Sequence, residues 1–354
     1  MKYFTLKYSW EYLLLVFLLG WVGCTSENGE TLPDETESDL PICLDVASEK
    51  MQNGRSLIEN STALQTACST GGQAIGIWSA HEKEGKLTQH VLANATGDVA
   101  LVFDTDGGSP NSWTYGELAF WRWEAKYYFN AYFPKEGGMT ITSNTPTSMK
   151  GTYNTLTTQQ DLMVCRASVD TGSENFRGSP IPLDMKHALS SLKFTFRLEE
   201  GARIARKIQS LSFDNTLAVS GTLEYQTGAI AISNWAELAY SSGAVYAWSN
   251  EGMSCTADNI ATAYTTPEGT ITTEGSFYCN NDGHLLIIPQ TCSEAPSITI
   301  VTDTKRFENV SLGNTQFEPG KLYVYNIVFN DVALDISLSI KDWNSYQSSH
   351  VIPL

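Results

Sequence analysis

The feature that most constrains the fold is a strict alternation of apolar and polar side chains along short stretches. Residues 192–198 read LKFTFRL, in which every second side chain is large and apolar. This period of two is typical of a strand with one face in a core and one face in water, so we expect Lys193 to face solvent. Residues 334–340 (LDISLSI) repeat the pattern, and residues 127–133 (YYFNAYF) alternate up to Pro134, which has no N–H for a strand ladder.

Short segments of this kind recur from about residue 42 to the C-terminus, between clusters of Gly, Asn, Asp and Ser. A helical period over more than ten residues is hard to find. Regular short strands with glycine-rich turns favour β-sandwiches over parallel α/β layers. We therefore predict an all-β fold.

The length predicts two domains. The chain has 354 residues, and a domain takes roughly 150. Residues 170–182 are rich in turn formers, and a strong strand follows them, so we place the boundary between a sandwich of residues 42–184 and one of residues 185–354. We see no repeat of fixed period, which argues against solenoids and propellers.

The charge balance is acidic, with 22 Lys and Arg against 39 Asp and Glu and a formal net charge of −17. Nucleic acid and anionic lipid are bound through clustered cations, so this balance argues against both as partners. An acidic surface suits a protein that is kept soluble outside the cell.

The N-terminus has the features of an export signal. Lys2 and Lys7 precede an apolar run at residues 12–19 (YLLLVFLL), which is too short to span a bilayer comfortably. Gly23 then stands directly before Cys24, as in a bacterial lipobox, whose cysteine is acylated and becomes the mature N-terminus. We expect a signal peptide at residues 1–23, lipidation of Cys24 and an acidic tether at residues 24–41. An uncleaved anchor and an ordinary signal peptide are the alternatives.

Six further cysteines leave two interpretations open. An even number in an exported chain permits disulfides, and buried free thiols are equally compatible with a chain of this length. No pair has C-x-x-C spacing, which argues against a thiolate zinc site. The six are Cys43, Cys68, Cys165, Cys255, Cys279 and Cys292.

Motifs for catalysis or metal binding are lacking. There is no G-x-S-x-G elbow, no H-E-x-x-H and no glycine-rich phosphate loop. Residues 104–111 (DTDGGSPN) resemble a calcium loop, but position 115 is Tyr where an EF-hand has Glu, so we expect a hairpin turn there. We predict no enzyme activity, no metal and no cofactor.

A dense aromatic stretch lies at residues 113–128. We expect its aromatic side chains to lie in the sandwich core, as large aromatic residues usually do. They are Trp113, Trp121, Trp123, Tyr127 and Tyr128. If some of them are exposed, they could stack on sugar rings, which would make the chain a stand-alone surface lipoprotein that binds glycan or host protein.

Fragments spread over the whole mature chain resemble the fimbrillin family of Bacteroidales, the lipoprotein subunits of type V pili. Each fragment is short, but their order and spacing match the family. They are residues 129–134 (FNAYFP), 160–163 (QDLM), 187–194 (HALSSLKF), 286–290 (LIIPQ), 319–323 (PGKLY) and 340–343 (IKDW).

The resemblance implies two tandem transthyretin-like Greek-key sandwiches and a structural or adhesive role in a pilus on the cell outer membrane. It also implies assembly by strand exchange with other pilus subunits, in which a protease cuts after an Arg and the first strand is replaced by a neighbour's segment. Here the removable strand would carry Ile42, Leu44 and Val46, and the cut would fall between Arg55 and Ser56.

The donor strand should lie near the C-terminus of a polymerising subunit. The alternating face needed for a donor is present in Leu334, Ile336, Leu338 and Ile340. The tail at residues 346–354 is another candidate. Either stretch could instead complete its own sandwich.

Overall fold

A computed structural model describes residues 37–47, 61–92, 97–105, 112–199, 208–214, 217–240, 246–249, 255–256, 259–261 and 284–343. Within these ranges the regular structure is almost entirely β, with one α-helix, α1 (Ser61–Ser69), and a 3-10 turn, η2 (Ile232–Asn234). The all-β prediction is confirmed. No helix in the described ranges is long and apolar enough to cross a membrane. The predicted signal peptide lies outside them.

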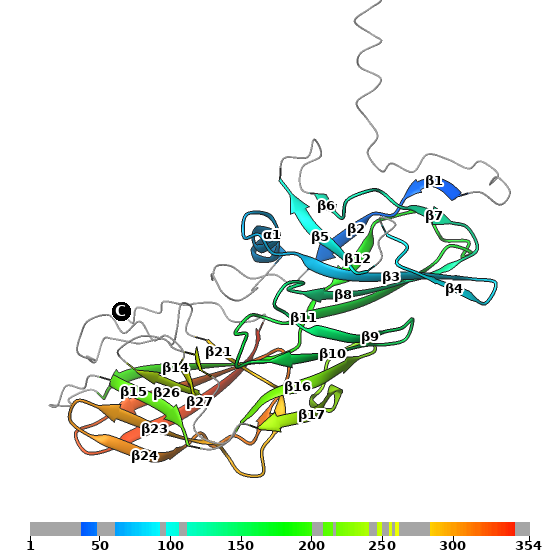
Figure 1. Cartoon of the computed structure of the whole chain (residues 1–354). Helices are drawn as coiled ribbons and strands as arrows, with labels where there is room; N and C mark the ends of the chain where they lie inside the picture. The colour runs from blue at the N-terminus through cyan, green and yellow to red at the C-terminus, as the bar shows by residue number, and fades with distance from the viewer. Residues whose placement is uncertain are drawn as a thin grey trace, which may run out of the picture.

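The N-terminal half is built on a seven-stranded sheet (Figure 1). Its central strand β8 alternates aromatic side chains, so one face of the sheet is lined with Tyr127, Phe129 and Phe133, all buried. Antiparallel pairing sets the order β13-β11-β8-β3-β5-β6, and β4 pairs with the far end of β3. The strands are β3 (Ile75–Lys83), β4 (Lys86–Gln89), β5 (Val99–Asp104), β6 (Ser112–Thr114), β8 (Lys126–Phe133), β11 (Met163–Asp170) and β13 (Lys186–His187).

Two short strand pairs cover the aromatic face of this sheet. β1 (Glu37–Pro41) pairs antiparallel with β7 (Phe120–Arg122), and β2 (Leu44–Ala47) pairs parallel with β12 (Ile181–Asp184). Helix α1 closes the same core with Leu64 and Cys68. All the buried residues of this core lie between positions 42 and 185.

A four-stranded sheet lies in the middle of the molecule. Its order is β17-β16-β10-β9, formed by β9 (Thr140–Asn144), β10 (Met149–Asn154), β16 (Ala218–Tyr225) and β17 (Trp235–Tyr240). Two of these strands precede residue 184 and two follow it, so the sheet joins the two predicted domains. The division into residues 42–184 and 185–354 stays a prediction, as does the tandem transthyretin-like arrangement.

The C-terminal half is a sandwich of two sheets around a core of its own, drawn from residues 192–329. One sheet has the order β21-β14-β26-β27, and the other β19-β20-β18-β15-β23-β24. The first contains β14 (Ser190–Leu198), β21 (Leu285–Ile287), β26 (Lys321–Phe329) and β27 (Leu334–Asp342). The second contains β15 (Ile208–Phe213), β18 (Tyr246–Ser249), β19 (Cys255–Thr256), β20 (Asn259–Ala261), β23 (Ser297–Thr302) and β24 (Arg306–Ser311). A short pair, β22 (Gln290–Thr291) and β25 (Gln316–Phe317), lies beside them.

The strand predicted from the alternation at residues 192–198 is β14, and Leu192, Phe194 and Phe196 are in the core. The expectation that Lys193 faces solvent is wrong, because its exposed fraction is 6%. Its cross-strand partner Val324 and its neighbour Ser191 are buried as well. This part of β14 is therefore covered on both faces, which an alternating pattern cannot reveal when the second face carries polar side chains.

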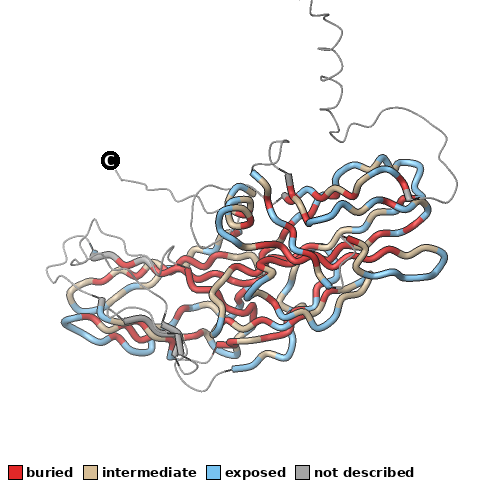
Figure 2. The backbone as a smooth tube through the Cα atoms, turned by 45° about the horizontal axis from the view of Figure 1, so that its top comes forward, coloured by how far each residue is buried: buried red, intermediate tan, exposed pale blue. Residues whose placement is uncertain are grey.

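Buried residues run through both halves of the molecule (Figure 2). Cys68 and Cys165 belong to the N-terminal core, and Cys292 packs against the C-terminal one. All three carry free thiols in this structure. Cys24 and Cys279 lie outside the described residues.

Candidate functional site

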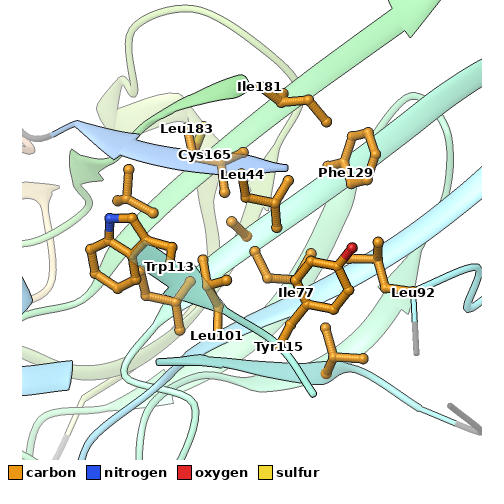
Figure 3. Packing of buried hydrophobic residues seen from close by; sticks show 14 of the residues in the cluster. Leu44, Ile77, Leu92, Leu101, Trp113, Tyr115, Phe129, Cys165, Ile181 and Leu183 are labelled. Carbon is orange, nitrogen blue, oxygen red and sulfur yellow. The ribbon is translucent and has the colours of Figure 1, made fainter. Parts of the chain in front are cut away.

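The first segment, residues 37–47, is inserted into the N-terminal core. Ile42, Leu44 and Val46, the side chains predicted to share one face, have exposed fractions of 1%, 5% and 3%. Figure 3 shows Leu44 lying among side chains from other strands, and the labelled residues of the same core include Ile77, Leu101, Phe129, Cys165 and Leu183. The predicted strand is thus a buried part of the fold.

Each of the two strands in the first segment pairs with a single partner strand. β2 runs parallel to β12 with Leu44 opposite Ile181 and Val46 opposite Leu183, and the described residues give it no second partner strand. The Ile181 N–H donates to the Cys43 carbonyl at 2.9 Å. β1 likewise pairs only with β7 in the described part of the chain. The segment therefore forms two two-stranded sheets in succession, one with β7 and one with β12.

The change of partner occurs at Ile42, where Tyr115 fills a gap in the ladder. The Ile42 N–H donates directly to the Ala119 carbonyl at 2.8 Å. The return bond passes through a side chain, because the Ala119 N–H donates to the Tyr115 hydroxyl at 3.4 Å and this hydroxyl donates to the Ile42 carbonyl at 2.6 Å. Burial raises the pKa of Tyr115 to about 12. A neutral phenol is thus held under the first segment.

Two features of this site lie beyond the sequence prediction. The end of the stretch expected to be an acidic tether forms β1, in which Glu37 pairs with Arg122 and Pro41 with Phe120 of β7. Tyr115 stands 73 residues from its partner Ile42 and no local pattern connects them. Residues 104–111, where we expect a hairpin turn, begin at the end of β5, and β5 and β6 pair antiparallel. Residues 106–111 lie outside the described ranges.

The predicted processing residues are not among those that the structure describes. Arg55 and Ser56 fall between the end of β2 at Ala47 and the start of α1 at Ser61. The predicted lipidation site Cys24 precedes β1. These assignments stay predictions.

The candidate donor strand is the edge strand β27. It pairs with β26 over its whole length, from Leu334 opposite Phe329 to Asp342 opposite Lys321. Leu334, Ile336 and Leu338 are half-buried against the C-terminal core, whereas Ile340 is 52% exposed. In this structure the strand completes its own sandwich, which is the alternative left open by its sequence.

The aromatic stretch is mostly core. Trp113, Trp121 and Tyr127 are buried, and Trp121 packs edge-on against Tyr127 with ring centroids 4.7 Å apart. Trp123 and Tyr128 are half-buried. These five residues do not form an exposed platform of the kind that stacks on sugars.

A hollow of about 800 Å³ lies where the two halves meet, next to β13 and the start of β26. Four of its charged side chains form two ion pairs: Lys186 Nζ is 2.8 Å from an Asp184 oxygen, and Lys321 pairs with Asp342. At its wall, His187 lies 2.9 Å from Asp161 and stacks on Trp343. Because these charges neutralise one another, we assign no ligand to the hollow. Among the described residues, no group of three His, Cys, Asp or Glu side chains is placed to hold a metal ion.

Comparisons with solved structures concern the fold. A fimbrial protein from Bacteroides vulgatus superposes with a TM-score of 0.53 at 16% identity, over 86% of this chain and 99% of that one. Candidate cell adhesion proteins from Bacteroides ovatus and Bacteroides uniformis give TM-scores of 0.49 and 0.45 at 15% and 14% identity, over 87% and 86% of this chain and 98% and 100% of theirs. The first of these likenesses shows a shared fold. No curated protein sequence matches the chain.

The family is shown by sequence. The fimbrillin-like family model matches residues 62–343, which is most of the chain, so the chain belongs to the fimbrillin-like family. The predicted membership of the fimbrillin family is confirmed. The predicted general role, that of a fimbrial protein of the cell surface, is confirmed as well. The matched stretch begins after the first segment and includes the whole wall around it.

Proposed function

We propose that this chain is a pilus subunit that joins its neighbours by strand exchange, in which residues 37–47 leave the N-terminal core and a segment of another subunit takes their place. One observation carries the proposal: the first segment supplies three fully buried side chains, yet its backbone pairs with only one short strand at a time, β7 and then β12. A segment of this kind can leave without breaking the ladder of a larger sheet, and the backbone groups left unpaired on β7 and β12 can then accept another strand.

The energetics allow the first segment to be exchanged once it has been cut. Three large apolar side chains, each contributing roughly 1.5–3 kcal/mol on burial, account for most of the attraction. The segment is part of the same chain before any cut, so its local concentration keeps the groove filled. After a cut, a free segment must bear an association cost of roughly 4–15 kcal/mol, so it can be lost and replaced.

The cut would fall between Arg55 and Ser56, in the stretch that connects β2 to α1. Cleavage there separates the first segment from the rest of the chain and leaves α1 in place. Lipidation of Cys24 would hold the uncut protein at the outer membrane, since acyl chains contribute roughly 0.8 kcal/mol per buried CH₂. The subunit has a structural or adhesive role and no catalytic one.

Limited digestion of the full chain with an arginine-specific protease tests the proposal. We expect a shorter chain that starts at Ser56, release of the first segment and SDS-resistant oligomers that grow with time. The Arg55→Ala variant should remain monomeric under the same treatment. The Arg177→Ala variant is the matched control, because Arg177 is an exposed arginine in the loop before β12, and it should assemble as the parent does.

Two results would contradict the proposal. One is a chain cut at Arg55 that keeps its first segment and stays monomeric. The other is assembly of the Arg55→Ala variant at the parent rate, which would mean that the first segment need not leave.

A further inference from the structure

Edge strand β27 presents a regular row of backbone groups along its outer side. The strand pairs with β26 over all nine of its residues without a bulge, and the described residues give it no partner on the other side. Edge strands β17 and β24 are less regular, because their pairings contain register shifts and each has a residue with positive φ, Glu237 in β17 and Asn309 in β24. Bulged edges resist pairing with another strand, whereas a long regular edge is a template for it.

The hydrogen bonds at the two ends of the β26–β27 pair show which backbone groups of β27 point outward. At one end the Asn330 N–H donates to the Ala333 carbonyl at 3.1 Å, and at the other the Trp343 N–H donates to the Gly320 carbonyl at 2.8 Å. In an antiparallel pair, residues that exchange bonds alternate with residues that do not. The bonds to β26 therefore fall on the odd-numbered residues of β27, and the N–H and C=O groups of its even-numbered residues face the open side.

The sequence of β27 reads almost the same in both directions. Residues 335–341 are Asp-Ile-Ser-Leu-Ser-Ile-Lys, which is symmetric about Leu338 except that Asp stands at one end and Lys at the other. When two copies of this strand pair antiparallel about Leu338, even-numbered residues meet even-numbered residues, so their outward N–H and C=O groups can exchange bonds. Unlike charges then meet at both ends of the pair. The opposite positions are Ile336 with Ile340, Ser337 with Ser339 and Asp335 with Lys341.

The exposure of Ile340 also favours a partner on this edge. Its side chain is 52% exposed, although it lies on the same face of β27 as Leu334, Ile336 and Leu338, which pack against the C-terminal core. In the symmetric pair, Ile340 lies beside Ile336 of the second copy, which covers part of its apolar surface. On the opposite face, the exposed Asp335 lies beside a lysine of the second copy.

We infer that β27 pairs antiparallel with β27 of a second copy of this chain, in the register that is symmetric about Leu338. The pair joins the sheet β21-β14-β26-β27 to its counterpart in one continuous sheet with a two-fold axis at Leu338. β27 stays in its own sandwich, so this contact is separate from strand exchange and needs no cut at Arg55. A contact along a single edge is small, so SDS dissociates it, and a chain that cannot be cut still runs as a monomer in SDS.

Charge reversal tests the pairing on the uncut full chain, with the oligomeric state measured by sedimentation velocity without SDS. The parent should form a dimer whose fraction rises with concentration. Asp335→Lys places two lysines at each end of the pair and Lys341→Asp places two aspartates there, so each variant should weaken dimerisation about tenfold. An equimolar mixture of the two variants should dimerise like the parent, because each lysine again meets an aspartate.

Glu224→Lys is the matched control for the change in net charge. It reverses an exposed carboxylate on β16, away from the edge, and should dimerise like the parent. A mixture of the two β27 variants that dimerises no better than either alone would overturn the inferred register. A parent that stays monomeric at every concentration would overturn the inference and leave the proposed strand exchange intact.

Cysteine cross-linking tests the register independently of charge. Ser337 lies opposite Ser339 of the second copy, whereas the two copies of Ser337 are offset by two residues along the pair. A mixture of the Ser337→Cys and Ser339→Cys variants should therefore form a disulfide-linked dimer on mild oxidation, and either variant alone should form far less. The parent, oxidised in parallel, controls for the native cysteines. Equal cross-linking in the mixture and in either single variant would overturn the inference.

Discussion

The hydroxyl of Tyr115 donates a hydrogen bond to the carbonyl of Ile42 across 2.6 Å, and this bond fastens the first segment to the body of the protein. Ile42 and Ala119 would exchange two backbone bonds in a regular antiparallel pair, and here the phenol carries one of them. At this contact the segment stops pairing with β7 and begins to pair with β12.

Removal of this hydroxyl should loosen the first segment without a change of fold. Tyr115→Phe keeps the ring in the core and leaves the Ala119 N–H and the Ile42 carbonyl without their buried partner. We expect a loss of about 1–3 kcal/mol in the free energy of unfolding, measured by urea denaturation. Tyr128→Phe is the control, because the Tyr128 hydroxyl contacts Glu82 in a half-exposed place, and it should lose less. Equal losses in the free energy of unfolding would mean that the bond to Ile42 stabilises the fold no more than the exposed contact of Tyr128 does.

Alkaline pH should release the first segment through the same residue. The pKa of Tyr115 is raised by burial to about 12 in the filled groove, against about 10 for a tyrosine in water. The stabilisation from the neutral phenol is therefore fully present below pH 10 and is lost as the pH rises through 12. After a cut at Arg55, dissociation of the first segment should be faster at pH 11 than at pH 8, as followed by gel filtration.

The Tyr115→Phe variant isolates this effect from the other buried tyrosines. Because phenylalanine does not titrate, the ratio of the dissociation rates at the two pH values should be smaller in the variant. An unchanged ratio would assign the alkaline effect to other groups.

Arg166 should be needed to join the N-terminal sheet to the middle sheet. From β11 its Nε donates to the buried Asn130 side chain at 2.8 Å, and its two terminal nitrogens reach the Pro146 and Gln226 carbonyls in the loops of the middle sheet. Arg166→Lys keeps the charge but has one terminal nitrogen for three acceptors. We expect a loss of about 1–3 kcal/mol in the free energy of unfolding. A lysine variant as stable as the parent would show that the charge alone suffices.

The sequence predicted those parts of the fold in which local pattern and tertiary structure agree. The alternation at residues 192–198 predicted β14, and the family resemblance implied a strand that carries Ile42, Leu44 and Val46. The alternation gave the wrong prediction for Lys193, because the polarity of a side chain does not reveal whether a distant part of the chain packs over it. Helix α1 was missed because its nine residues bury only Leu64 and Cys68, which is too little for a helical period to be visible.

The candidate site was predictable only in part, for the same reason. The family resemblance implied that Ile42, Leu44 and Val46 lie on the removable strand, but the partners of this segment come from residues 115–184, far along the chain. The Tyr115 bond and the parallel pairing with β12 depend on how distant segments meet.

The N-terminal sequence of subunits isolated from SDS-resistant assemblies tests the central claim most directly. The account predicts that the chains in these assemblies start at Ser56 and lack residues 37–47. Assembled chains that start at an acylated Cys24 and still contain the first segment would contradict it.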